Sequence, residues 1–385
     1  MTDHFRSVSI VGIGQIPVQK ENPKSIREMG VEAIHLAMQD AGIDSIDALF
    51  VGNMLADELQ NQKHIATLIA SAAGLRGIEA LHVRAATATG AAALRMAYFA
   101  VASGEARRAI ALGVEKMSSG EATPALAKAL DAELETPTGA TLLNLNARLM
   151  QMYIDKYGIS VDDFNNFALN AHRNALTNPY ALFKDKEVTE EIVHNSRVIV
   201  PPLRLYDASP VCDGAAAVVL TRSDEARAYT NRPIKILSSS VATDWFRIED
   251  RPDPLYLSAA ARSAKDAFRK ANVHRTDIDF FEVHDAFSIM SCLALEAIGF
   301  AEQGQGVRLA TENEIRLDGS VPISTFGGLK ARGHPIGATA IYQTCEIVLQ
   351  LMGRAGKNQV KNAQLAMLLS IGGAASTTLT HIFGV

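Results

Sequence analysis

The chain has few of the features that mark disulfide-bonded, membrane or nucleic-acid-binding proteins. Its 385 residues include three cysteines, an odd number without metal-ligand spacing (Cys212, Cys292 and Cys345). No apolar run approaches the roughly 18 residues of a membrane span, and the first residues lack the apolar core of a signal peptide. With 37 basic against 42 acidic side chains, no basic stripe for nucleic acid or a membrane surface stands out. We expect a cytoplasmic protein without a metal site that binds neither nucleic acid nor membrane.

The length of the chain is sufficient for more than one domain, and its beginning has an α/β pattern. Residues 7–13 alternate and are rich in β-branched side chains, which predicts a buried strand. Ser25 and Glu28 have the spacing of a capping box, so a helix is expected to begin after Ser25. Gly42 is a typical residue at a helix C-terminus, and residues 47–54 predict the next strand.

The same order of elements recurs in the second part of the chain. Residues 234–241 predict a strand and residues 257–271 an Ala-rich amphipathic helix that ends at Asn272. Residues 277–283 then predict another strand. A repeat of whole β/α units predicts a duplicated α/β fold, in which the two halves pack their helices together and share one cleft.

Each predicted half continues with a helix and a strand of small residues. One helix starts near Gly90 and the other near Gly337, and both have an Ala-rich first turn. The strands that follow are expected at residues 109–114 and 366–373. The resemblance between the halves therefore extends beyond their first strands.

Between the two halves, the pattern changes over roughly residues 120–200. Helices are predicted at residues 142–157 and 161–177. An insertion of this length typically covers a site or builds a subunit contact. Met150 lies on the first of these helices, where the core is its more typical environment, and we also consider it as a substrate contact. The predicted division is a first half of residues 1–119 and 201–230, an inserted domain of residues 120–200 and a second half of residues 231–385.

A glycine-rich loop precedes the last predicted helix. Gly327, Gly328 and Gly337 let the backbone approach a ligand closely, and Pro335 restricts the motion of the loop. His334 lies in the middle and can exchange a proton near neutral pH. The helix N-terminus that follows is a common place for an anion or a developing oxyanion. From this loop alone, a tight connection with an incidental histidine stays an equal alternative.

Several sequence blocks, spread over nearly the whole chain, form one consistent pattern: Val101–Gly104, Gly113–Met117, Asp207–Pro210, Asp213–Ala216, His284–Phe287 and Gly327–Thr339. Together they resemble the thiolase superfamily, in the branch that contains the archaeal acetoacetyl-CoA thiolases and the sterol-carrier-protein-type thiolases. The resemblance implies a five-layered αβαβα thiolase fold, with the insertion as a loop domain over the acyl-CoA site. It also implies a homodimer or tetramer, and coenzyme A as part of the substrate with no tightly bound cofactor.

The chain departs from this family at both catalytic cysteines. Thr87 occupies the position of the nucleophile, at the predicted start of a buried helix. Ser370 and Ala286 occupy the two positions at which the family carries its acid–base cysteine. Ser324 replaces the Asn that usually opens the Gly-Gly block. Because a Thr hydroxyl is much harder to deprotonate than a Cys thiol, a covalent acyl-enzyme is unfavourable here.

Other parts of the family's site are retained. His284 matches the residue that helps to hold the thioester oxygen, and His334 matches the second histidine of the site. The backbone N–H groups of Thr87 and Gly372 are expected to form an oxyanion hole, which a side-chain replacement leaves intact. Tyr342, close to the loop, is considered either as a phenolic acid or base or as a wall of the pocket. The expected substrate contacts are Ser370, Gly327, Gly328 and Met150.

These residues favour the stabilisation of an enolate without an acyl-enzyme, which is what a retro-aldol cleavage of a β-hydroxyacyl-CoA requires. Within the superfamily, relatives without the Cys act as aldol lyases on steroid side-chain substrates, and this chain is similar in having lost the nucleophile. The first alternative is acetyl-CoA C-acyltransferase (thiolase) activity with Thr87 as a substitute nucleophile and His334 as its base. The second is a non-catalytic acyl-CoA-binding or scaffold subunit, because proteins of this branch often pair with a small OB-fold (zinc-ribbon) protein. The two retained histidines argue against a scaffold.

Overall fold

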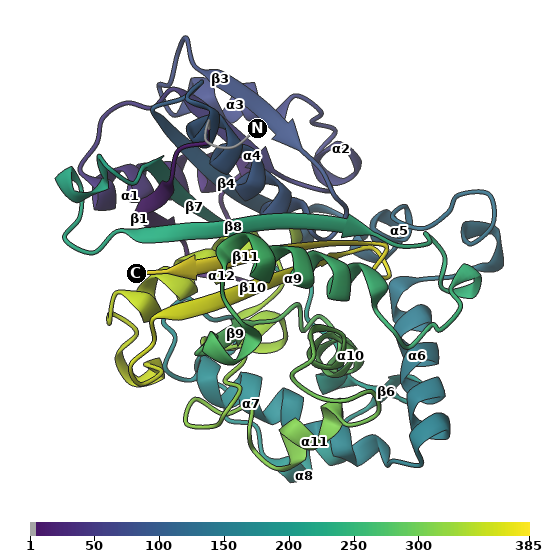
Figure 1. Cartoon of the computed structure of the whole chain (residues 1–385). Coiled ribbons are helices and arrows are strands. Elements are labelled where there is room, and N and C mark those ends of the chain that lie inside the picture. The colour runs from purple at the N-terminus through teal and green to yellow at the C-terminus, as the bar shows by residue number, and fades with distance from the viewer. Residues whose placement is uncertain (1–4) are drawn as a thin grey trace.

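Two similar halves and an insertion form the described part of the chain, residues 5–385, in the computed structural model (Figure 1). The first half contains β1 (Val8–Gln15), α1 (Ile26–Ala41), β2 (Ala48–Gly52), α2 (Ala56–Leu59), α3 (Ile65–Ala72), β3 (Glu79–Val83), α4 (Thr89–Ser103), β4 (Arg108–Lys116) and β7 (Asp213–Arg222). The second half contains β8 (Ile234–Thr243), α9 (Ser258–Ala271), β9 (Phe280–Glu282), α10 (Ser288–Ile298), α11 (Gly306–Thr311), α12 (Ile336–Leu351), β10 (Leu365–Gly372) and β11 (Thr377–Gly384). The recurrence of β/α units that the sequence predicts is confirmed.

The strands of the two halves run in mirrored order. The first half contributes β3-β2-β4-β7-β1, and the order continues as β8-β11-β10-β9 in the second half. β1 and β8 meet antiparallel through two residue pairs, Ser9–Lys235 and Ile10–Ile234. The nine strands are therefore connected through this short junction, and helices carry much of the remaining contact between the halves.

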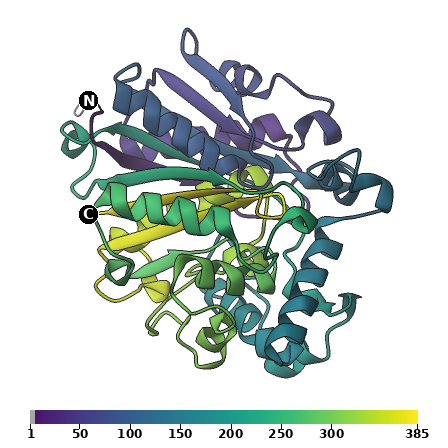
Figure 2. The same ribbon diagram turned by 45° about the vertical axis from the view of Figure 1, so that its right-hand side comes forward.

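Helices α4 and α12 form the central layer of the fold. α12 packs against α4, against β4 and β7 of the first half, and against β10 of the second half. α1 and α3 cover the outer face of the first sheet, and α9 covers that of the second sheet and packs against α10. Figure 2 shows the layers one above the other, with the first half at the top. This is the expected five-layered αβαβα arrangement.

Local signals explain where α1 begins and ends. The Ser25 hydroxyl accepts a hydrogen bond from the Glu28 backbone N–H, and the Glu28 carboxylate accepts one from the Ser25 N–H. Gly42 ends the helix in the left-handed conformation, with φ of 64°, which glycine adopts without steric cost. The apolar side of the helix, including Met29 and Ala33, is fully buried against the first sheet. The capping box and the stop predicted from the sequence are both confirmed.

Four glycines let the two halves touch at the N-terminus of α12. A methyl group on Gly90 of α4 would lie 2.7 Å from the carbonyl oxygen of Gly337, and one on Gly113 of β4 would meet the same oxygen. A methyl group on Gly337 would lie 2.6 Å from the carbonyl oxygen of Gly52, at the end of β2. Such distances exclude a side chain, so backbone packs on backbone here. This contact positions the loop that carries His334.

The insertion packs beside the second half, below and to the right in Figure 1. It contains α5 (Ala122–Ala127), α6 (Leu142–Tyr157), α7 (Asn165–Ala175), α8 (Glu190–His194), β5 (Val198–Val200) and β6 (Leu203–Arg204). The helix predicted at 161–177 begins later than expected, because Val161–Phe164 forms a separate 3₁₀ turn. Among residues 5–385, no helix has the length and apolarity that crossing a bilayer requires.

Candidate active site

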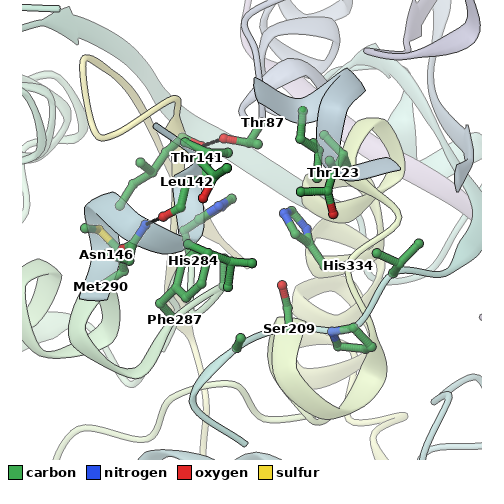
Figure 3. A pocket seen from close by; sticks show the side chains of 18 of the residues that line it. Thr87, Thr123, Thr141, Leu142, Asn146, Ser209, His284, Phe287, Met290 and His334 are labelled. Carbon is green, nitrogen blue, oxygen red and sulfur yellow. Dashed lines mark hydrogen bonds between the residues drawn. The ribbon is translucent and has the colours of Figure 1, made fainter. Parts of the chain in front are cut away.

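A cavity of about 130 Å³ lies where the insertion meets both halves (Figure 3). Thr87 reaches it from the turn before α4, His284 from the end of β9 and His334 from the loop before α12. Leu142 of α6 and Met290 of α10 supply apolar walls. The structure thus brings three of the predicted site residues, distant in the sequence, into one cavity.

The two histidines face one another in this cavity. Their ring centroids are 5.2 Å apart and the rings are nearly perpendicular, at 88°. Burial lowers the pKa of His284 to about 4. Burial also lowers the pKa of His334 well below its ordinary value, and the neighbouring His284 and Arg332 lower it further. Both rings are therefore neutral near pH 7, and a neutral imidazole can donate with one nitrogen and accept with the other.

Two contacts fix the position of His334. Its backbone N–H donates to the Cys212 sulfur at 3.1 Å, and its Nδ1 lies 2.8 Å from the Thr339 hydroxyl, on the first turn of α12. Because Nδ1 is occupied, Nε2 is the nitrogen that can act on a ligand. The sequence did not reveal any group that orients this histidine. Thr339 is such a group, and it lies within the sequence block that carries the family resemblance.

The Thr87 hydroxyl is already bonded to the protein backbone. Its Oγ1 donates to the Ile371 carbonyl oxygen at 2.6 Å, so its proton is not shared with His334. Ala86, just before it, has a φ of 48°, in the left-handed region that costs a non-glycine residue about 1 kcal/mol. A methyl group on Gly372 would lie 2.6 Å from the Ala85 carbonyl oxygen. The backbone of Gly372 thus packs closely on the turn that carries Thr87, and the oxyanion hole formed by their N–H groups stays a prediction.

The structure corrects the expectation for Tyr342. Its hydroxyl donates to the Ile16 carbonyl oxygen at 2.7 Å and accepts from the Ala215 N–H at 3.0 Å. The side chain is fully buried outside the cavity, and burial raises the pKa of its hydroxyl well above the ordinary value. Tyr342 thus links α12 to the first half through these two hydrogen bonds. It does not reach the cavity, so it is neither an acid or base for a substrate nor part of the cavity wall.

The structure also corrects the expected substrate contacts, because none of the four lines the cavity. Met150 is buried in the core of the second half and the insertion. Ser370 is enclosed in β10, where its hydroxyl has no hydrogen-bond partner. Gly327 and Gly328 have φ values of 108° and 53° and form the turn beside Asp285. Both glycines therefore lie outside the lining of the cavity.

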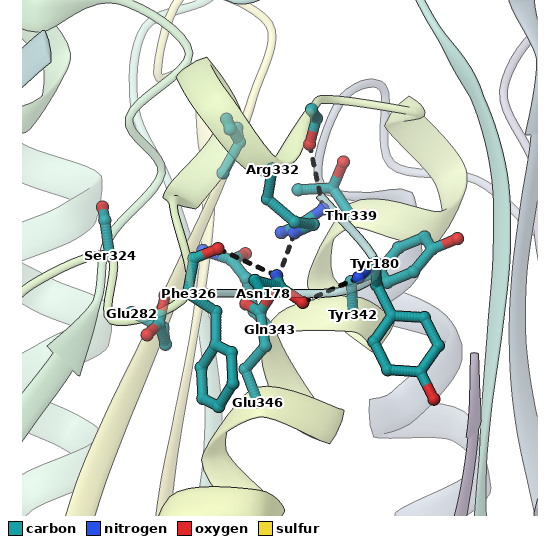
Figure 4. A network of polar contacts seen from close by, with 12 residues as sticks. Asn178, Tyr180, Glu282, Ser324, Phe326, Arg332, Thr339, Tyr342, Gln343 and Glu346 are labelled. Carbon is teal, nitrogen blue, oxygen red and sulfur yellow. Dashed lines mark hydrogen bonds and ion pairs between the residues drawn. The ribbon is translucent and has the colours of Figure 1, made fainter. Parts of the chain in front are cut away.

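A buried network of polar and charged side chains, part of which Figure 4 shows around Arg332 and Glu346, lies close in sequence to the two histidines. Arg332 donates to the Glu346 carboxylate at 2.9 Å, and the Lys330 ammonium lies 3.3 Å from the Asp285 carboxylate. Glu282 accepts hydrogen bonds from both the backbone and the hydroxyl of Thr325. Burial raises the pKa of Glu282 to about 8 and that of Glu346 to about 7. These contacts hold the residues on either side of His284 and those just before His334.

No cysteine lines the cavity, and all three lie within the described residues. Cys212 follows the cavity residue Val211 and accepts a hydrogen bond from the His334 backbone N–H. Burial raises the pKa of its thiol to about 12, so it stays protonated and unreactive near neutral pH. Burial likewise raises the pKa of the Cys292 and Cys345 thiols.

Comparisons with known proteins agree with the fold. Residues 8–224 match the model of the thiolase N-terminal domain, and residues 240–385 match that of the thiolase C-terminal domain. The chain belongs to the thiolase superfamily. Its duplicated halves, with the histidines at the cavity, are those of a thiolase-like acyl-CoA enzyme.

Similar proteins and solved structures carry several different names. An acetyl-CoA acetyltransferase of Methanothermobacter thermautotrophicus is 43% identical, over 98% of this chain and 100% of that protein. Sterol carrier protein 2 of Gallus gallus is 30% identical, over 97% of this chain and 71% of that protein. Among solved structures, an Ltp2-ChsH2(DUF35) aldolase is similar with a TM-score of 0.86 at 23% identity, over 98% of both chains. A human mitochondrial 3-ketoacyl-CoA thiolase in complex with CoA has a TM-score of 0.77 at 16% identity, over 98% of both chains.

Proposed function

We propose that this thiolase-superfamily protein cleaves, and in reverse forms, a C–C bond of a β-hydroxyacyl-CoA by aldol chemistry without an acyl-enzyme. The observation that carries the proposal is the hydrogen bond from the Thr87 hydroxyl to the Ile371 carbonyl. Thr87 occupies the nucleophile position, and among the described residues no cysteine lines the cavity. Two neutral histidines face the same space, and they are suited to proton transfer and hydrogen bonding.

In the proposed reaction, His334 Nε2 takes the proton of the β-hydroxyl. The bond between the α and β carbons then breaks, and its electron pair forms the enolate of the shorter acyl-CoA, while the β carbon leaves as a ketone or aldehyde. His284 and the backbone N–H groups of Thr87 and Gly372 stabilise the enolate oxygen. One such donor is typically worth about 3 kcal/mol. The proton on His334 finally returns to the α carbon, so the step is balanced without an oxidant or a second substrate.

The substrate supplies coenzyme A, and the proposal includes no tightly bound cofactor. We further propose a homodimer or tetramer, with a small OB-fold (zinc-ribbon) protein as a partner of the complex. The similar aldolase structure is named for a DUF35 component beside Ltp2, which supports the idea of a small partner. The names of the sterol carrier protein relatives support a lipid or steroid acyl group.

Acetyl-CoA C-acyltransferase activity is the second candidate, because a relative with 43% identity over nearly the whole chain is named acetyl-CoA acetyltransferase. In that reaction Thr87 would have to release the Ile371 carbonyl and carry an acyl group. The two functions therefore differ in one observable species, an ester on Thr87.

The test is to incubate the protein with a 3-hydroxyacyl-CoA and, separately, with acetoacetyl-CoA plus CoA, and to follow the CoA thioesters by mass spectrometry. We expect a shorter acyl-CoA and a carbonyl product from the first reaction only. The same assays are repeated with the OB-fold partner present and with Thr87→Cys, whose thiol restores a nucleophile at the start of α4 and is expected to add thiolysis. Thiolysis by the unaltered protein, with an acyl group on Thr87 or Ser370, would overturn the proposal.

A further inference from the structure

Residues 208–212 form a short segment that joins the loops of the two histidines. At one end, Ala208 pairs with Phe287 and the Ser209 N–H donates to the Ala286 carbonyl oxygen at 2.8 Å, just beyond His284. At the other end, the Cys212 sulfur accepts the hydrogen bond from the His334 N–H. The segment is thus held at both ends and lines the cavity between them.

Ser209 carries a hydroxyl on this fixed segment. In Figure 3 the hydroxyl points toward the ring of His334. Ser209 is half-buried, and its backbone N–H is already used, so the side chain is the polar group that it presents to the cavity. Thr123 of α5 also points its hydroxyl toward the His334 ring in this view, but it is exposed and lies on a short helix.

We propose that Ser209 is a further catalytic residue, whose hydroxyl donates a hydrogen bond to the β-oxygen of the substrate while His334 Nε2 accepts the proton of that same β-hydroxyl. The inference rests on the proposed function and adds a specificity determinant to it. An alcohol both donates and accepts, so it satisfies the pair formed by Ser209 and His334. In the tautomer in which Nδ1–H donates to Thr339, His334 Nε2 only accepts, so a β-ketone, which also only accepts, would leave it without a partner.

The reaction proposed above gives Ser209 a defined task. As the α–β bond breaks, the β-oxygen passes from an alcohol to the carbonyl of the leaving product, and its proton moves to His334. The Ser209 hydroxyl keeps its own proton and stays hydrogen-bonded to this oxygen throughout. It therefore positions the β-oxygen against His334 without any net change in its own bonding.

The inference is tested by the binding of two stable probes, so that turnover is not needed. One is a CoA thioether with a 3-hydroxyalkyl chain, in which a methylene replaces the thioester carbonyl and prevents cleavage; the other is the same thioether without the hydroxyl. Titration calorimetry on the full chain is expected to show tighter binding of the hydroxylated probe. Ser209→Ala is expected to lower the affinity for that probe by about fivefold to tenfold, the usual effect of one hydrogen bond. The affinity for the other probe should not change. Ser209→Thr, which keeps a hydroxyl, is expected to retain the preference.

Three outcomes would overturn the inference. The first is that the unaltered protein binds both probes equally. The second is that Ser209→Ala weakens the binding of both probes alike, as the loss of a purely structural residue would. The third is that Thr123→Val removes the preference for the hydroxylated probe while Ser209→Ala keeps it. Because the probes are not cleaved, these outcomes are independent of the proposed reaction. A Ser209-dependent preference together with a failure to cleave any 3-hydroxyacyl-CoA would contradict the proposed function alone.

Discussion

At the scale of single residues, the proposed reaction uses the backbone N–H of Thr87, while the Thr87 side chain is hydrogen-bonded to the Ile371 carbonyl. We expect Thr87→Ala to keep aldol cleavage within about tenfold of the unaltered rate, because the N–H group that faces the oxyanion survives. The loss of one hydrogen bond should lower the free energy of unfolding by about 1 kcal/mol. Steady-state kinetics and urea unfolding measure both. A loss of activity of a thousandfold or more would show that the hydroxyl takes part in the chemistry.

At the same scale, the burial of His334 predicts how the catalytic rate depends on pH. Its pKa is lowered well below the ordinary value of 6.5 by burial and by the neighbouring His284 and Arg332, so it stays an unprotonated base in mildly acidic solution. We expect kcat/KM for aldol cleavage to stay nearly constant from pH 8 to about 6 and to fall only in more acidic solution. A pH profile of initial rates checks this. A midpoint at 6.5 would contradict the burial of the base.

At the scale of elements, an added methyl group should destabilise the protein far more at the glycine contact between the halves than at an ordinary helix end. A methyl group on Gly113 would meet the backbone of Gly337 in α12, so Gly113→Ala must push two halves apart. Gly42 is the matched control: its φ is 64° but a methyl group there would meet nothing. We expect Gly42→Ala to cost about 1 kcal/mol and Gly113→Ala at least twice as much. Equal thermal shifts for the two variants would contradict this view of the contact.

The same elements show how far the sequence predicts the structure. The start of α1 at Ser25 and the end of α9 at Asn272 depend on local signals, and both were predicted correctly. The duplication was also visible, because each half repeats its pattern of β-branched strands and small-residue helices. The helix predicted at residues 142–157 is confirmed as α6, but the later start of α7 follows from a 3₁₀ turn that periodicity alone does not distinguish from a helix.

The site was predicted less completely, for a physical reason. His284 and His334 lie in sequence blocks with a family pattern, so their meeting could be expected. The partners of Tyr342, the Ile16 carbonyl and the Ala215 N–H, lie far away in the chain, and no local pattern records a tertiary hydrogen bond. Ser209 was inside a recognised block, yet its role depends on where its hydroxyl points.

At the scale of the whole molecule, buried acids and buried histidines should set the pH of maximum stability. Burial raises the pKa of Glu282 to about 8, so the folded state binds more protons than the unfolded state and loses stability as pH rises from about 4.5 to 8. The buried histidines, with lowered pKa values, act in the opposite sense: they cost stability as pH falls below about 6.5. We therefore expect a maximum near pH 6.

Glu282→Gln separates these contributions, because an amide oxygen can still accept both hydrogen bonds from Thr325. Urea unfolding at pH 6 and pH 8.5 should show a smaller loss of stability in this variant than in the unaltered protein, by an amount on the order of 1 kcal/mol. Glu32→Gln, which removes a partly exposed carboxylate paired with Lys24 on α1, is the control and should leave the difference unchanged. An identical alkaline loss in all three proteins would mean that Glu282 is ionised when folded.

The 208–212 segment belongs to the chain of the first half and yet is bonded to both histidine loops of the second half. It therefore acts as a spacer that sets the gap between the two rings. A slight rotation of one half against the other would change this gap before any strand lost its partner. The catalytic rate should therefore respond to a change in the alignment of the halves before the secondary structure does. We expect moderate hydrostatic pressure to abolish activity while the circular dichroism spectrum is still that of the native protein.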